Sequence, residues 1–136
     1  DALLVSAYGG FLIAQAAARR MLPHGAGAIL MTGASSSVKG FAQSGVFAMG
    51  KFALRGLAQS MARELGPQGI HVAHSIIDGG IDTDFVRGLR PDFDALKAKD
   101  GVLSPDAIAQ AYVGLHKQHR SAWTHELDLR PWMESW

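Results

Sequence analysis

The chain has 136 residues, which is enough for one domain with a modest hydrophobic core. Its formal net charge is +1 at pH 7, so no excess of either sign indicates nucleic acid as a partner. It contains no cysteine, which excludes disulfides and thiol catalysis and leads us to expect a cytoplasmic protein.

The first predicted element is a helix over residues 2–22, where apolar side chains recur at helical spacing up to Pro23. Residues 2–18 carry no charge, and a stretch of this length could cross a bilayer. Ser6, Gln15 and many alanines make it only weakly hydrophobic, so we expect a buried helix and no membrane span. No basic, apolar and small-residue leader is visible, and we expect no secretory signal.

Two apolar runs predict strands that are buried on both faces. One covers residues 28–31 and the other residues 70–77. A loop at residues 33–37 follows the first strand, and the sequence Asp-Gly-Gly at residues 78–80 closes the second.

The longest predicted helix covers residues 42–66. Lys51 and Arg55 are its only charged residues before Arg63, and most of its circumference is apolar. Such a helix is normally covered on both sides, which we also expect here. Lys51 is the anomaly, because an ammonium group in apolar surroundings needs an anion, a polar ligand or a route to water.

The remaining elements are a solvated excursion, a helix and a strand. Residues 82–100 are dense in charge and are predicted to be partly helical. Ser104 can cap a helix that begins at Pro105. Residues 123–129 alternate apolar and polar side chains, which predicts a strand covered on one face.

The order of these elements, helix and strand in turn, predicts an α/β fold with a parallel sheet and crossover helices. Three strands are few for such a sheet. We therefore expect residues 1–136 to form a single domain that is truncated at its N-terminus or needs a partner to complete its sheet.

A pocket is predicted beside Lys51. Ligands of open α/β sheets bind beyond the carboxyl ends of the strands, and the loops at residues 33–37 and 78–83 both leave strands there. Phe47 lies one helical turn before Lys51 and shares its face. The alternative is that both loops are ordinary turns and that the Lys51 side chain reaches water along the surface.

Several motifs resemble those of the short-chain dehydrogenase/reductase family. Phe47-x-x-x-Lys51, followed by Phe-Ala-Leu, resembles the Tyr-x-x-x-Lys signature of the active-site helix. Residues 78–83 resemble the family's Pro-Gly-x-Ile-x-Thr segment, with Asp78 in place of proline, and residues 66–72 resemble the approach to that strand.

The resemblance implies the second half of a doubly wound, Rossmann-like domain, without the glycine-rich phosphate loop of the first half. It implies NAD or NADP as cofactor, with Lys51, Gly79, Ile81 and Thr83 at the nicotinamide end, and a small carbonyl or alcohol substrate. It also implies a homo-oligomer formed through the helices at residues 2–22 and 42–66.

The catalytic set departs from the family pattern. Phe47 has no hydroxyl group and cannot move a proton in place of tyrosine. Ala34 stands where the resemblance places a serine, Ser35 is one position late, and Ser6 occupies the place of an asparagine. Two hypotheses follow: an oxidoreductase with an altered proton route through Ser35 or bound water, and a catalytically silent relative that serves as a binding or assembly module.

Other motifs compete for the same residues. Residues 45–51 match the start of a phosphate-binding P-loop, but Phe52 follows where a magnesium-binding hydroxyl belongs. Residues 33–37 lack the second glycine of a serine-hydrolase elbow. We expect no metal site, because His71 and His74 are three apart on a strand and point to opposite faces.

Overall fold

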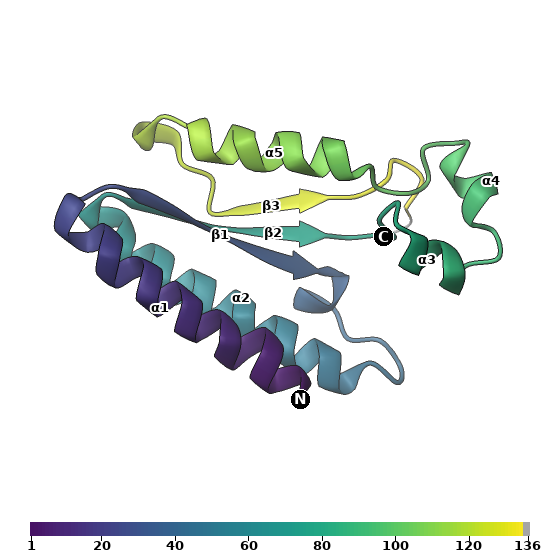
Figure 1. Cartoon of the computed structure of the whole chain (residues 1–136), viewed down its shortest axis with the longest axis horizontal. Helices are drawn as coiled ribbons and strands as arrows, with labels where there is room; N and C mark the ends of the chain where they lie inside the picture. Colours follow the sequence, from purple (N-terminus) through teal and green to yellow (C-terminus); the bar gives the residue numbers. More distant parts are fainter. Residues whose placement is uncertain (135–136) are drawn as a thin grey trace.

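The structure is a computed structural model that describes residues 1–134. Three strands form one parallel sheet in the order β1-β2-β3: β1 (Gly27–Ala34), β2 (Ile70–Ile77) and β3 (Glu126–Leu129). Helices α1 (Gly9–Met21) and α2 (Gly45–Leu65) lie on one side of the sheet and α5 (Pro105–Lys117) on the other (Figure 1). The predicted α/β fold with a parallel sheet and crossover helices is confirmed.

The N-terminal helix begins irregularly. Residues 4–8 form a π-helical turn (η1, Leu4–Tyr8) that continues into α1, and a 3₁₀ turn (η2, Leu22–His24) ends it. Gly25 follows in the left-handed conformation at φ 57°, which suits a residue without a Cβ. The helix predicted over residues 2–22 is therefore present, with a π turn that its spacing did not indicate.

Two glycines let α1 and α2 approach closely. A Cβ on Gly10 would lie 2.7 Å from a methyl group of Leu54, and a Cβ on Gly50 would lie 3.1 Å from the Ser6 side chain. Behind this contact, side chains from both helices and two strands form the main core: Ala14, Ala18, Ile29, Met31, Leu54, Ala58, Met61, Leu65, Ile70 and Val72. The core fixes α2 on the sheet and thereby sets where its N-terminal turns lie.

Strand β2 agrees with the prediction residue for residue, and all eight of its residues are buried. For β1 the prediction is wrong in two respects. The strand runs beyond residues 28–31 to Ala34, because every residue from Gly27 to Ala34 pairs with β2, so the predicted loop begins as strand. It is also not buried on both faces, since Thr32 is exposed on the face turned away from α1 and α2.

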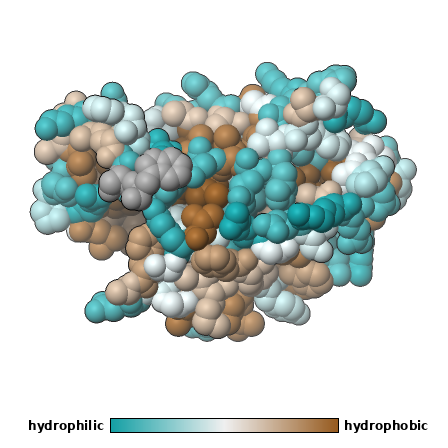
Figure 2. Space-filling view, turned by 180° about the vertical axis from the view of Figure 1, so that it is seen from behind, coloured by the Kyte–Doolittle hydropathy of each residue, from teal (hydrophilic) through white to brown (hydrophobic). Residues whose placement is uncertain are grey.

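The outward faces of α1 and α2 are exposed, so the expectation that α2 is covered on both sides is wrong for the described residues. The sheet and α1 cover one part of α2 and leave another part open. Figure 2 shows apolar residues along the lower edge of the molecule, where these helices lie. The exposed apolar side chains are Leu4, Val5, Tyr8, Phe11, Leu12, Ile13, Val46, Phe47, Met49 and Phe52.

The charged excursion is partly helical, as predicted, with α3 (Asp84–Leu89) and α4 (Phe93–Lys97). Helix α5 begins at Pro105, and the Ser104 hydroxyl accepts a hydrogen bond from the Ala107 backbone N–H. Strand β3 is shorter than the predicted strand at residues 123–129, because its pairing with β2 begins only at Glu126.

Candidate active site

The carboxyl ends of β1 and β2 open into a hollow of about 440 Å³. The turn after β1 (η3, Ser35–Ser37), the N-terminal turns of α2 and the segment after β2 surround it. Its walls are mainly apolar and backbone atoms, contributed by Thr32, Gly33, Ala34, Ser35, Ser36, Phe41, Phe47, Lys51, Ile77, Gly79, Gly80, Ile81 and Val86. This is the position at which parallel α/β sheets bind ligands.

Lys51 is the cationic side chain of this hollow. Its Nζ donates a hydrogen bond of 3.1 Å to the Thr32 carbonyl, which is the polar ligand that the sequence required without identifying. No carboxylate of residues 1–134 lies within ion-pair distance of this ammonium group. Burial lowers the pKa of Lys51 below its ordinary value.

The Phe47 ring lies over the same ammonium group, with its centroid 5.7 Å from Lys51 Nζ. A cation–π contact at an exposed site is worth roughly 0.5–1 kcal/mol, and Phe47 is 46% exposed, so the ring favours the charged amine only weakly. Phe47 brings no hydroxyl group to the cavity. Phe47 therefore lies beside Lys51, as helical spacing predicted, and offers a ring face but no proton donor.

The turn after β1 supplies the hydroxyl groups of the site. Ala34 lines the hollow and offers only a methyl group, whereas Ser35 and Ser36 also line it. The buried Ser37 hydroxyl accepts a hydrogen bond of 3.0 Å from the Ala34 N–H and so holds the turn itself. Ser35 is thus brought to the cavity with Phe47 and Lys51, as the sequence predicted.

The segment after β2 is held by Asp78, at the position where the family motif has proline. The Asp78 N–H donates to the Leu129 carbonyl at 2.8 Å, a bond that proline cannot form. Its carboxylate is buried and pairs with Lys39 at 3.5 Å and Arg130 at 3.3 Å. Asp78 therefore ties the end of β2 to the loop before α2 and to the residue after β3.

Of the residues predicted to meet a cofactor, Lys51, Gly79 and Ile81 line the same hollow. Thr83 does not line it; its hydroxyl accepts a hydrogen bond from the Val86 N–H at 3.2 Å and caps α3. Phe41, Val86 and the Thr32 carbonyl were missed. Nothing in the local sequence pattern distinguishes them, since tertiary packing brings them to the cavity.

A partly buried ionic network links α2 to the sheet and was also missed. Arg55, one turn after Lys51, donates two hydrogen bonds to Glu126, with Nε–Oε2 at 2.8 Å and Nη2–Oε1 at 2.7 Å. His74 Nδ1 lies 3.0 Å from Glu126 Oε2. The hydrogen bond from Arg55, with a smaller contribution from His74, lowers the pKa of Glu126, whereas burial lowers the pKa of His74.

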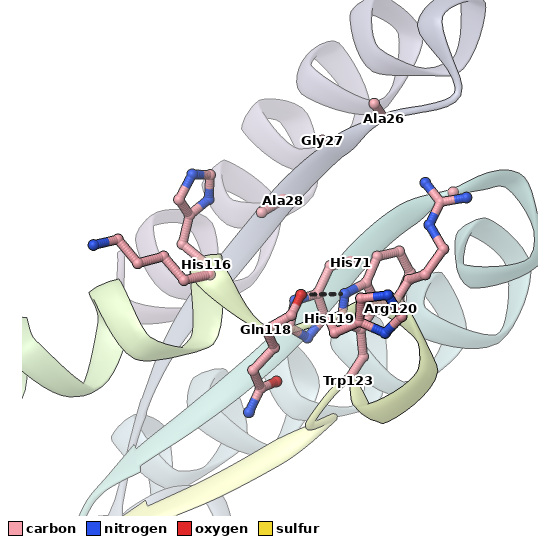
Figure 3. A pocket seen from close by; sticks show the side chains of 11 residues that line it. Ala26, Gly27, Ala28, His71, His116, Gln118, His119, Arg120 and Trp123 are labelled. Carbon is pink, nitrogen blue, oxygen red and sulfur yellow. Dashed lines mark hydrogen bonds between the residues drawn. The ribbon is translucent and has the colours of Figure 1, made fainter.

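A second hollow, of about 470 Å³, lies at the opposite end of the sheet, near the amino ends of β1 and β2 (Figure 3). His71 stacks on Trp123 there at 4.8 Å, and the Trp123 Nε1–H donates to the Gln118 carbonyl at 3.3 Å. His116 and His119 lie near its rim on the exposed end of α5 and the following turn. Within residues 1–134 no three His, Cys, Asp or Glu side chains are grouped so that they could hold a metal ion.

Comparison with known proteins gives consistent matches. A family model described as Enoyl-(Acyl carrier protein) reductase matches residues 1–126. A short-chain dehydrogenase from Rhodopseudomonas palustris has a TM-score of 0.75 at 40% identity, over 96% of this chain and 50% of that chain. The (+)-borneol dehydrogenase 1 of Salvia officinalis is 33% identical over 126 residues, which cover 86% of this chain and 48% of that protein.

A more distant structure, serine dehydrogenase complexed with NADP+, has a TM-score of 0.76 at 19% identity, over 94% of this chain and 53% of that chain. At this identity the likeness shows the fold alone. This chain spans about half the length of each of these three proteins. No helix among residues 1–134 is both long and apolar enough to cross a membrane.

Proposed function

Because this chain belongs to the short-chain dehydrogenase/reductase family, we propose that it forms the substrate-proximal half of an oxidoreductase that uses NAD or NADP and acts on a small carbonyl or alcohol compound. The observation that carries the proposal is the cavity at the carboxyl ends of β1 and β2, where Lys51 lies beside an apolar wall and a glycine-containing segment. The remaining strands of the doubly wound domain would pair with β1, in line with the share of each relative that the chain covers.

The residues present fit the nicotinamide end of the cofactor. Lys51 Nζ uses one of its donors on the Thr32 carbonyl and has further donors for ribose hydroxyls. Gly79 and Ile81 would border the nicotinamide ring, and Thr83, which caps α3, would act from just outside the cavity. When bound, the cofactor supplies or accepts the hydride that interconverts the carbonyl and the alcohol.

The chain's own residues would orient the substrate and provide its proton. The apolar wall that includes Phe41, Phe47 and Ile77 would pack against the hydrocarbon part of a small substrate in the hollow. Phe47 cannot serve as the acid, so the proton would come from the Ser35 hydroxyl or from bound water. Such a route is slower than one through a tyrosine whose pKa is lowered by a neighbouring lysine.

The outward faces of α1 and α2 support a homo-oligomer. They expose a continuous set of large apolar side chains, including Leu4, Val5, Ile13, Val46 and Met49, and a second copy of the same face would cover them. We also propose that the protein is cytoplasmic and that residues 1–136 belong to a single domain.

The test puts back the two hydroxyl-bearing residues of the family pattern, with Phe47→Tyr and Ala34→Ser. Because the chain spans about half of its relatives, the assay uses a protein in which a glycine-rich first half from a relative precedes residue 1. NAD(P)H oxidation is measured against a panel of small ketones and aldehydes. A positioned general acid is worth roughly 10²–10⁴-fold in rate. We expect little activity from the parent, a small gain from Phe47→Tyr, and a more than additive gain when Ala34→Ser is added.

Phe52→Tyr is the matched control, because Phe52 is similarly exposed on the same helix but does not line the cavity. It should leave the rate unchanged. A parent protein that is already fast and is slowed by Phe47→Tyr would show that phenylalanine belongs to a different mechanism. The absence of hydride transfer in the parent and in all variants would favour the catalytically silent alternative.

A further inference from the structure

We propose that Lys51 forms imines with small apolar aldehydes and ketones that enter the cavity at the carboxyl ends of β1 and β2, an activity separate from hydride transfer. The proposal rests on how this amine is held and on what surrounds it. It requires neither a nicotinamide cofactor nor a hydroxyl group at position 47.

The Lys51 amine has a backbone carbonyl as its hydrogen-bond partner and no carboxylate beside it in the described part of the chain. Its Nζ donates to the Thr32 carbonyl at 3.1 Å, and no Asp or Glu of residues 1–134 pairs with it. A neutral amine can keep this hydrogen bond and still offer a lone pair, whereas an ammonium group has none to offer. An amine held in a largely apolar site is the arrangement that activates lysine as a nucleophile.

The other lysines of the chain are held differently. Lys39 pairs with Asp78 at 3.5 Å and Lys97 with Asp82 at 2.6 Å, so a carboxylate stabilises the charged form of each. Lys99 and Lys117 are exposed to water. Burial also lowers the pKa of Lys51, which agrees with the geometry. Lys51 is therefore the lysine that we expect to be the most reactive.

The cavity selects the carbonyl compound. Five large apolar side chains line it, together with the Ala34 methyl group: Phe41, Phe47, Ile77, Ile81 and Val86. Ser35, Ser36 and Thr32 are the hydroxyl-bearing residues of the lining, and the Thr32 hydroxyl is hydrogen-bonded to the Tyr112 hydroxyl. A volume of about 440 Å³ accommodates a small ketone or aldehyde beside Lys51. Cationic carbonyl compounds would lose hydration against these walls and would gain no anionic partner from the lining residues.

The step is balanced without an oxidant or a reductant. The amine nitrogen gives its lone pair to the carbonyl carbon, a carbon–nitrogen bond forms, and the carbon–oxygen bond breaks. The oxygen leaves as water with two of the three protons of the lysine ammonium, and the protonated imine keeps the third. Water reverses the reaction, so the imine accumulates only where the cavity limits water.

Reductive trapping tests the proposal on the 136-residue chain. The chain is incubated with 2-butanone and sodium cyanoborohydride, which reduces an imine to a stable secondary amine, and peptide mapping by mass spectrometry gives the rate at each lysine and at the amino terminus. We expect Lys51 to be labelled about tenfold or more faster than Lys117, a difference of about 1.4 kcal/mol or more in activation free energy. Equal rates at Lys51 and Lys117 overturn the proposal.

Two further arms show whether the reaction takes place in the cavity. Ala34→Leu fills part of the hollow, and 2-butanol competes for it without forming an imine, so each should slow labelling at Lys51 and leave Lys117 unchanged. If neither does, the cavity does not bind the ketone and the proposal fails. NADPH tests the proposed function separately, and this arm uses the protein in which a glycine-rich first half from a relative precedes residue 1. There, protection of Lys51 by NADPH supports the cofactor position, and its absence refutes that position while the imine result on the 136-residue chain stands.

Discussion

Removing the Glu126 carboxylate should destabilise this fold more than any exposed ion pair. Glu126 receives two hydrogen bonds from Arg55 on α2 and lies beside His74 on β2, so it joins the helix that carries Lys51 to two strands. We expect Glu126→Ala to lower the free energy of unfolding by about 3 kcal/mol, within a range of roughly 2–4 kcal/mol.

The magnitude follows from what each partner loses. A hydrogen bond to a charged group contributes roughly 1.5–3 kcal/mol. The side chains of Arg55 and Glu126 are 29% and 25% exposed, so water screens their pair and can hydrate Arg55 once Glu126 is gone. The His74 side chain is fully buried and cannot be hydrated. Its unpaired Nδ1 therefore adds a desolvation penalty of roughly 1–3 kcal/mol.

The assay is urea unfolding followed by circular dichroism, with Asp92→Ala as the matched control. Arg90 and Asp92 also form a two-pronged pair, at 3.2 and 3.1 Å, but their side chains are 44% and 57% exposed and lie two residues apart. The control should leave the free energy of unfolding nearly unchanged, because water screens this exposed pair. With m values of roughly 1–3 kcal/mol/M, Glu126→Ala should move the midpoint by about 1–3 M urea. Equal effects of the two substitutions would refute the reasoning.

Three other predictions concern pH, assembly and cofactor affinity. Folding lowers the pKa of His74, so the unfolded chain binds a proton at a higher pH than the folded chain does. The free energy of unfolding should therefore fall as the pH drops below the ordinary histidine value of 6.5. The fall should be smaller in His74→Gln. The Glu126 pKa is also lowered, so its contribution is present above the ordinary glutamate value of 4.5 and is lost as the pH falls through the lowered value. Light scattering at micromolar concentration should show self-association, and Ile13→Glu should weaken it. Val113→Glu should not, because Val113 is exposed on α5, away from the α1 and α2 faces. A stable monomer of the parent chain would contradict the prediction. Calorimetry should show weak or no binding of NAD(H) or NADP(H) to the 136-residue chain, because its sequence has no glycine-rich turn to hold the pyrophosphate. Micromolar affinity would contradict this prediction.

The sequence predicted β2 well because each of its residues is buried, so local hydrophobicity and tertiary environment agree. It predicted β1 poorly because Thr32 and Gly33 resemble turn residues, whereas pairing with β2 keeps them in the strand. Gly33 is there for a long-range reason: a Cβ would lie 2.3 Å from His74 Nε2. A close approach between two strands leaves no mark on the local pattern.

The candidate site likewise has features that the local sequence predicted and features that only tertiary packing sets. Phe47 and Lys51 share a face because helical spacing requires it, so their proximity could be predicted. The Thr32 carbonyl that holds Lys51 could not, since its position depends on how α2 lies on β1. Arg55 and Glu126 are 71 positions apart, and nothing in either local sequence links them.

Phe47, Ala34 and Asp78 lie at one end of the sheet, and they contribute to it in different ways. Phe47 and Ala34 bring no hydroxyl group to the cavity and leave these parts of its wall apolar. Asp78, in contrast, adds a backbone hydrogen bond to Leu129 and two ion pairs that proline could not make. This combination of a well-held cavity, a Lys51 amine with no carboxylate partner among residues 1–134 and a phenylalanine beside that amine is the reason why we propose altered carbonyl chemistry for the site.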